Sequence, residues 1–77
     1  MVSVKVYSSP GCPHCQNAKR FLYENNIEFE DFDVAINREK FEEMKKKSGQ
    51  MGVPVIDVNG EIIIGFDEIE LRKTLNL

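Results

Sequence analysis

The sequence has no tryptophan, one histidine and only two cysteines among its 77 residues. Two cysteines cannot build a framework of disulfides, and in a reducing compartment such a pair is more often catalytic or metal-binding than structural. No apolar stretch approaches the roughly 20 residues needed to span a bilayer. The N-terminus lacks the basic and apolar segments of a secretory signal. We therefore expect a cytoplasmic protein that does not enter a membrane.

An excess of positive charge is also missing, because 10 Lys and Arg face 13 Asp and Glu, for a net charge of -3. Basic residues do not alternate with aromatics along any stripe, which argues against nucleic-acid binding. The only basic run, Lys45-Lys46-Lys47, is expected to be the solvated end of a helix, where it complements the helix dipole. The length allows a single small domain over residues 1–77, with a core that is only just sufficient, and we expect a monomer.

Both cysteines lie in one motif, Cys12-Pro13-His14-Cys15, which follows a run of strand-forming residues and precedes an amphipathic segment. A C-x-x-C motif in this setting indicates a redox dithiol. Pro13 suits the first position of a helix, where its missing N–H costs nothing. Cys12 then caps the helix, and the free N–H groups and the dipole favour its thiolate, so we predict that Cys12 is the nucleophile. Cys15 shares its helix face and is predicted to be the resolving thiol.

His14 is the only histidine and lies between the two cysteines. We interpret it as a residue that donates to the Cys12 sulfur or stabilises its thiolate through space, because a neighbouring histidine favours a cysteine thiolate. The alternative interpretation is an exposed residue with no electrostatic role.

The apolar periodicity predicts the element order β-α-β-α-β-β-α. Strands are expected over residues 2–7, 27–34, 53–58 and 61–64, and helices over residues 13–26, 37–48 and 66–75. The alternation slips near Asp31, which predicts a bulge or an early end of the second strand. Asn59-Gly60 is a strong hairpin signal, and the first βαβ unit predicts a parallel pair. In the last helix we expect Asp67 to be the cap and Ile69, Leu71 and Leu75 to include the buried residues.

Three separated motifs resemble those of the small dithiol glutaredoxins of the thioredoxin superfamily, and the resemblance covers essentially all 77 residues. It implies an α/β thioredoxin fold, with a four-stranded mixed sheet and helices on both faces. The matching segments are Cys12-Pro13-His14-Cys15 with Ala18-Lys19, which is similar to C-P-x-C-x-x-A-K; Val53-Pro54, which is similar to the cis-proline loop; and Asn59-Gly60 with Gly65-Phe66-Asp67.

The resemblance also implies site residues. Pro54 would follow a cis peptide bond beside the Cys12 sulfur, and the Val53 backbone would pair with an extended substrate chain. The alternative for Pro54 is a proline at the start of an edge strand. Gly65, Phe66 and Asp67 would form a binding loop in which Asp67 meets the amino group of glutathione.

Two further residues have open roles. We interpret Lys19 as a surface or partner-contact residue, because it lies seven residues from Cys12. Tyr7 would either flank the site from its strand end or be a half-buried strand aromatic.

The electron donor stays open between glutathione and thioredoxin reductase. Glutathione-using members typically have a basic residue ahead of the first cysteine, a tyrosine inside the motif, a threonine before Val-Pro and two glycines before the last helix. Here those places hold Pro10-Gly11, His14, Gly52 and Ile64-Gly65. The Gly65-Phe66 pair is closer to the glutaredoxin-like hydrogen donors of ribonucleotide reductase, which take electrons from thioredoxin reductase. Asp67 keeps glutathione possible as a co-substrate.

The sequence thus predicts a thiol–disulfide oxidoreductase that reduces protein or low-molecular-weight disulfides through a Cys12–Cys15 redox-active disulfide, with no bound cofactor. One alternative is a metal or iron–sulfur module in which two chains share thiolates, since this motif supplies only two of the four ligands usual for zinc. Another is a non-catalytic interaction domain that keeps the fold.

Overall fold

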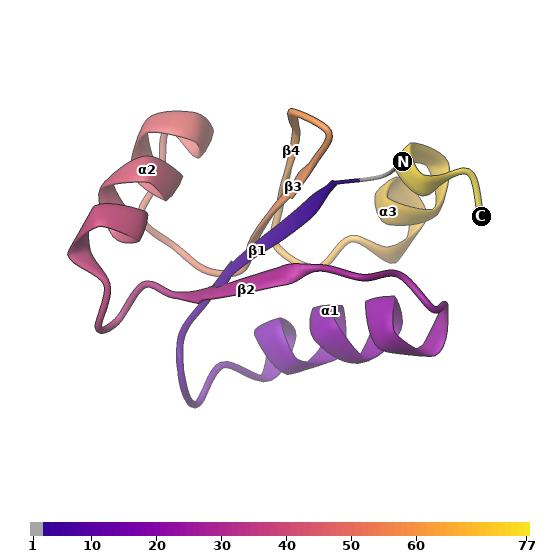
Figure 1. The fold of residues 1–77 in the computed structure, drawn as a ribbon, viewed down its shortest axis with the longest axis horizontal. Helices are drawn as coiled ribbons and strands as arrows, with labels where there is room; N and C mark the ends of the chain where they lie inside the picture. Colours follow the sequence, from indigo (N-terminus) through magenta and orange to yellow (C-terminus); the bar gives the residue numbers. More distant parts are fainter. Residues whose placement is uncertain (1–2) are drawn as a thin grey trace.

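The computed structural model describes residues 3–77, which form one sheet covered by three helices. The strands are β1 (Val4–Ser8), β2 (Glu30–Asp33), β3 (Val55–Val58) and β4 (Glu61–Ile64), in the spatial order β2-β1-β3-β4. Strand β1 pairs in parallel with β2 and antiparallel with β3, and β3 pairs antiparallel with β4 (Figure 1). The four-stranded mixed sheet is confirmed. The predicted start of the first strand at Val2 lies outside the described residues.

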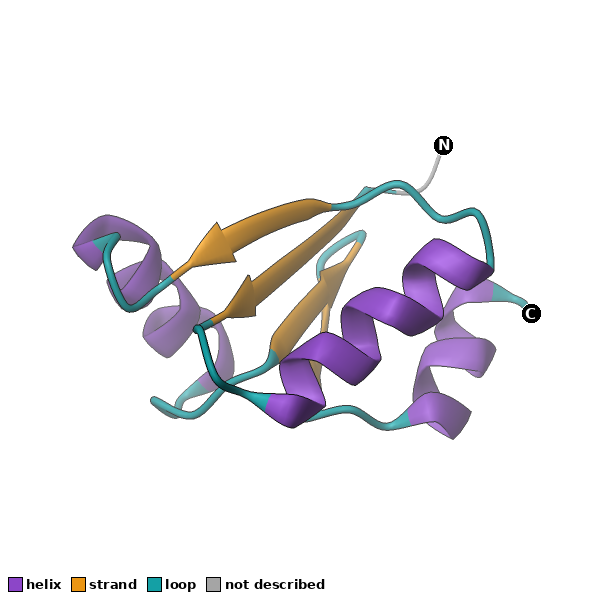
Figure 2. Ribbon diagram, turned by 90° about the horizontal axis from the view of Figure 1, so that it is seen from below, coloured by secondary structure: helices purple, strands orange, loops and turns teal. Residues whose placement is uncertain are grey.

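The helices cover both faces of the sheet, as predicted. Figure 2 shows the sheet between α2 (Arg38–Ser48) on one side and α1 (Pro13–Glu24) with α3 (Glu68–Leu75) on the other. Each face has its own apolar cluster. The cluster under α1 and α3 consists of Val4, Val6, Ala18, Phe21, Leu22, Ile56, Val58, Ile63, Leu71 and Leu75. The cluster under α2 consists of Tyr7, Val34, Met44 and Val55, with Phe32, Phe41, Val53 and Ile62 at its margin.

Local sequence signals explain where α2 and α3 begin and end. The side chains of Asn37 and Asp67 cap them, each accepting a backbone N–H at 3.1 Å, from Lys40 and Glu70 respectively. Such a cap satisfies one of the backbone donors that a helix start leaves free. Helix α2 ends at Gly49, whose φ of 73° is left-handed and therefore favours glycine. No helix within residues 3–77 combines the length and apolar character that crossing a membrane requires.

Four details of the sequence prediction are wrong. Two are starts predicted two residues too early, because β3 begins at Val55 rather than residue 53 and α3 at Glu68 rather than residue 66. The second strand begins at Glu30 rather than at residue 27, because Asn26 is left-handed (φ 58°) and the Ile27 N–H donates back to the Leu22 carbonyl at 2.9 Å. Residues 25–27 therefore form the turn that ends helix α1, and the chain reaches the sheet only after this turn. Ile69 was expected in the core and is 70% exposed. At 100° per residue it points away from the face that carries Leu71 and Leu75.

Candidate active site at the start of helix α1

Cys12 is the N-cap residue of α1, with extended backbone angles (φ -104°, ψ 105°). Its Sγ accepts the backbone N–H of Cys15 at 3.2 Å. The turn before it passes through Gly11, whose φ of 73° suits glycine, and Pro13 opens the helix. Cys12 is partly exposed. Its sulfur therefore combines access from solvent with the positive end of the helix dipole, which favours an anion.

Cys15 has the opposite environment. It is only 1% exposed, and both cysteines are free thiols in this structure. Burial, together with the hydrogen bond that involves Cys12, raises the pKa of Cys15 to about 11, while a backbone hydrogen bond from Ser9 and the charge of Lys19 act in the opposite direction. The pair is therefore asymmetric, with an accessible sulfur at the helix end and a protonated, buried thiol one turn later.

The loop before β3 lies against this helix end. The Val53–Pro54 peptide bond is cis, Pro54 is buried, and the Val53 carbonyl oxygen lies 4.0 Å from the Cys12 Sγ. The Pro54 carbonyl in turn accepts the N–H of Gly65 at 2.8 Å. The Val53–Pro54 loop thus lies between the Cys12 sulfur, which it approaches through Val53, and Gly65, which binds Pro54.

Within the segment 65–67, each residue has a different environment. The ring of Phe66 is partly buried and packs on Phe21 of α1, with 6.0 Å between the ring centroids. Asp67 is exposed, and one carboxylate oxygen accepts the Glu70 N–H. The predicted binding loop is therefore adjacent to the Val53–Pro54 loop, but the Phe66 side chain belongs to the packing between α1 and α3.

His14 lies in the first turn of α1, with its side chain exposed. Within residues 3–77 that side chain makes no hydrogen bond, and the donor to the Cys12 sulfur is the Cys15 backbone N–H instead. The predicted hydrogen bond from His14 to Cys12 is therefore absent from the part of the chain that the structure describes. An effect through space stays a prediction.

Tyr7 does not flank the thiols, so that prediction is wrong. Its side chain is fully buried under α2, on the opposite face from α1. The hydroxyl donates to Glu43 and accepts a hydrogen bond from Lys47 at 2.9 Å. Alternation along β1 is the reason, because Val6 and Ser8 point toward α1 and Tyr7 between them must point the other way.

Lys19 lies on the inner edge of α1 and forms an ion pair with Asp31 of β2, with 3.0 Å between Nζ and Oδ2. The other carboxylate oxygen of Asp31 accepts the Ser8 hydroxyl at 2.7 Å. The sequence prediction related Lys19 only to Cys12, and no sequence signal marks Ser8 or Asp31 as part of the site. The spacing of four residues between Cys15 and Lys19 could have linked Lys19 to the buried thiol, because such residues share a helix face.

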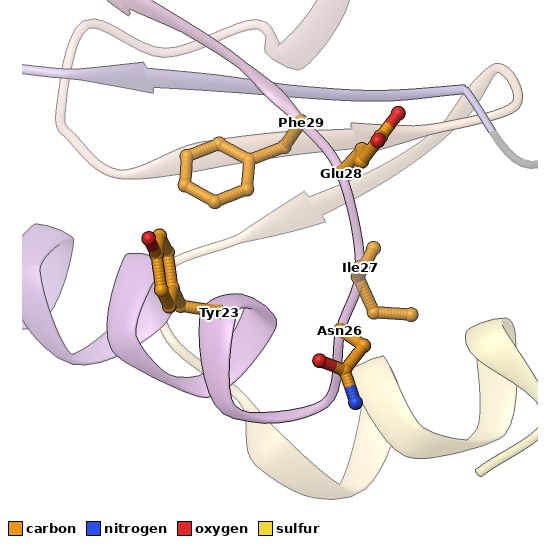
Figure 3. A pocket seen from close by; sticks show the side chains of 5 residues that line it. All are labelled: Tyr23, Asn26, Ile27, Glu28 and Phe29. Atoms are coloured by element: carbon orange, nitrogen blue, oxygen red, sulfur yellow. The ribbon is translucent and has the colours of Figure 1, made fainter.

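A surface hollow lies at the other end of α1. Figure 3 shows its lining, in which the rings of Tyr23 and Phe29 border the opening and Ile27 lies across from them. It is separated from Cys12 by the length of the helix and carries no cysteine or histidine. Within residues 3–77 no three His, Cys, Asp or Glu side chains come together in a way that would hold a metal ion.

The sheet order and the two thiols at a helix start define a thioredoxin-fold redox protein. Comparison with known sequences narrows this class, because the glutaredoxin family profile matches residues 4–63. An uncharacterized glutaredoxin-like 8.6 kDa protein in the rubredoxin operon of Clostridium pasteurianum is 44% identical over 72 residues, which cover 94% of this chain and 96% of that protein. Glutaredoxin 3 of Escherichia coli is 35% identical over 69 residues, which cover 90% of this chain and 83% of that protein. The chain belongs to the glutaredoxin family.

Solved structures agree with this assignment. The crystal structure of the thioredoxin-like protein BC3987 superposes with a TM-score of 0.87 at 30% identity, covering 92% of this chain and 97% of that chain. The glutaredoxin-like protein NrdH-redoxin from Escherichia coli superposes with a TM-score of 0.80 at 22% identity, covering 91% of this chain and 92% of that chain, and supports the fold alone.

Proposed function

We propose that this protein is a thiol–disulfide oxidoreductase in which Cys12 is the nucleophile and Cys15 resolves. The observation that carries the proposal is the asymmetry of the two sulfurs. Cys12 is accessible at the positive end of α1, and Cys15 is buried behind it with its N–H 3.2 Å from the Cys12 Sγ. Reactive cysteines lie in partly exposed places that favour the thiolate, whereas the resolving partner needs only to reach the first sulfur.

The reaction balances in two exchanges. The Cys12 thiolate attacks one sulfur of a substrate disulfide, the substrate S–S bond breaks, and the second substrate sulfur leaves as a thiolate that takes a proton from water. Cys15 then loses its proton, and its thiolate attacks the Cys12 sulfur of the mixed disulfide. The Cys12–Cys15 bond forms and the first substrate sulfur leaves with the electron pair. The substrate gains two electrons, the dithiol loses two, and an external thiol donor restores it.

The Val53–Pro54 loop is the proposed substrate contact. The Val53 carbonyl lies 4.0 Å from the Cys12 Sγ, so a peptide bound there in an extended form would place its sulfur beside the nucleophile. Gly65 and Asp67, next to this loop, are proposed to receive the amino end of glutathione when glutathione is the partner, and Phe66 holds their loop on α1. Disulfide-bonded proteins are the other proposed substrates. The cytoplasm suits this role, because it keeps such dithiols reduced.

The first test compares two electron supplies. NADPH consumption is measured with a small disulfide and with a disulfide-bonded protein, once with glutathione plus glutathione reductase and once with thioredoxin reductase alone. We expect turnover with at least one supply, and the active supply identifies the donor. The Cys12→Ser variant is the matched control. Equal rates for this variant and the wild type, or no turnover with either supply, would contradict the proposed function.

A further inference from the structure

An ion pair lies between helix α1 and the sheet, next to the resolving thiol. Lys19 follows Cys15 by four residues, which puts their Cβ atoms about 6 Å apart on one helix face. The Lys19 Nζ lies 3.0 Å from Oδ2 of Asp31, and the two side chains are 30% and 41% exposed. Asp31 is paired with Val6 in the β1–β2 register, and Val6 belongs to the cluster under α1. The Asp31 carboxylate therefore points toward the helix that carries the thiols.

Asp31 is held in place from the sheet side. Its Oδ1 accepts the hydroxyl of Ser8, which is only 3% exposed, at 2.7 Å. The backbone of the next residue, Ser9, lowers the pKa of Cys15 and so favours its thiolate. The hydrogen bond from Ser8 thus fixes the Asp31 carboxylate on the side of the sheet that faces α1.

The Lys19–Asp31 ion pair is expected to contribute little to the free energy of unfolding, so stability alone does not explain why it lies beside Cys15. Partly exposed ion pairs contribute little to stability, because solvent screens them and fixing two long side chains costs entropy. A charge beside a buried thiol has a larger effect on the equilibrium between thiol and thiolate, because the surroundings of the thiol screen it less than water would.

We propose that Lys19 and Asp31 are positioning residues that set the rate of the resolving step, with Lys19 favouring the Cys15 thiolate and Asp31 limiting that effect. The inference rests on the proposed function. It concerns the second exchange only, in which Cys15 loses its proton to water, attacks the Cys12 sulfur and expels the substrate thiolate. A free lysine would make Cys15 ionise more readily, and the carboxylate offsets part of its charge.

The groups that act on Cys15 are Cys12 and Lys19 on α1 and the backbone of Ser9 after β1. Asp31 of β2 reaches the thiol through its ion pair with Lys19. The facing segment 52–55 carries no titratable side chain. Substitution of Lys19 or Asp31 therefore changes one charge at a time near the thiol.

The experiment separates the two exchanges with an aromatic disulfide whose released thiolate is coloured. Reduced protein releases one equivalent when Cys12 attacks and a second when Cys15 resolves, and the second phase is followed by stopped flow against pH. We expect Lys19→Met to slow the second phase about threefold to tenfold at neutral pH and to move its pH profile upward. Asp31→Asn is expected to speed it and to move the profile downward.

Three controls distinguish charge from structure. Lys19→Arg keeps the charge and should behave like the wild type, and Arg20→Met removes a charge from an exposed neighbour on α1 and should leave the second phase unchanged. The Lys19→Met/Asp31→Asn double variant should return toward the wild-type rate, and high salt should shrink every difference.

If Lys19→Met and Asp31→Asn moved the pH profile of the second phase in the same direction, or if neither moved it, the inference would be overturned. The proposed function would remain intact. Absence of the first phase in the wild type would instead refute the proposed function.

Discussion

The two faces of the sheet differ in how many hydrogen-bond partners their ionisable groups have. Under α2, the Tyr7 hydroxyl donates to Glu43 and accepts from Lys47, and Lys47 also binds Asp57 at 2.7 Å. At the start of α1, the Cys12 sulfur has one backbone donor, with the Val53 carbonyl 4.0 Å away. The α2 face therefore satisfies its polar groups within the fold, whereas the α1 face leaves a sulfur partly exposed to solvent.

The pKa shifts on the α2 face follow from this pairing. Burial and the hydrogen bond to Glu43 raise the pKa of Tyr7, so that its hydroxyl stays protonated. Burial alone would raise the pKa of Asp57, but the hydrogen bonds from Lys47 and from the Gly60 N–H outweigh it, and the net shift is downward. These groups are locked in the protonation states that hold α2 on the sheet, and Val53 packs at the margin of the same cluster. The α2 face thus also supports the Val53–Pro54 loop, through the packing of Val53.

The largest expected effect is the loss of disulfide reduction when Cys12 on the α1 face is replaced. Cys12→Ser should abolish disulfide reduction, because serine cannot form the mixed disulfide, and should change the free energy of unfolding by less than about 0.5 kcal/mol, because the site is partly exposed. Turnover and denaturant unfolding measure the two quantities. Cys15→Ser is the comparison, since it should still attack and then accumulate a mixed disulfide visible by mass spectrometry. Equal residual turnover in the two variants would contradict the assigned roles.

The next largest effect is a loss of stability when Lys47 on the α2 face is replaced. Lys47→Met removes the partner of Asp57, which is 7% exposed, and should lower the free energy of unfolding by about 1–2 kcal/mol. Turnover should change by less than about twofold, because no reacting atom is touched. Lys46→Met is the matched control, because Lys46 is the preceding residue of the same helix and forms no ion pair within residues 3–77. Equal destabilisation by the two variants would show that the Lys47–Asp57 contact is not what holds α2.

The sequence predicted the fold because its signals are local. Strand alternation, the Asn37 and Asp67 caps and the Asn59-Gly60 turn each act within a few residues, and the structure shows the elements that they indicate. The errors at β2 and at Ile69 have different causes. The late start of β2 comes from a local turn, in which the left-handed Asn26 lets the Ile27 N–H donate to the Leu22 carbonyl. The exposure of Ile69 depends on which side of α3 meets the sheet, which no local signal specifies.

As with the fold, the local part of the site was predictable and its long-range contacts were not. The spacing of Cys12 and Cys15 and the position of Pro13 could be interpreted from the motif itself, because one helix start fixes all three. The partners of Tyr7 could not, since Glu43 and Lys47 lie 36 and 40 residues away and reach it only after α2 packs on the sheet. The Lys19–Asp31 pair needs the parallel register of β1 and β2, which no local pattern specifies.

Lowering the pH should weaken the α2 face, because the free energy of unfolding depends on the charge of Asp57. Its pKa is lowered on folding, so it stabilises the fold above the unfolded pKa of about 4, and this contribution is lost as the pH falls through the folded value. Asp57→Asn should therefore be less stable than the wild type at neutral pH, and the gap should narrow as the pH falls below about 4. Denaturant midpoints measured across this range test the sign. A gap that stays constant would mean that Asp57 acts through its hydrogen bonds and not through its charge.

The smallest expected effect concerns His14. Its side chain is exposed and lacks a hydrogen bond within residues 3–77, and the Cys12 sulfur takes its hydrogen bond from the backbone. Solvent and salt screen a charge in such a place, so His14→Val should change the rate of Cys12 alkylation by less than about threefold between mildly acidic and neutral pH. Gln16→Val, also exposed on α1, is the control. A tenfold loss in His14→Val alone would show that the imidazole stabilises the thiolate through space. The α1 face would then depend on a side-chain charge, as the α2 face does, and not on the helix backbone alone.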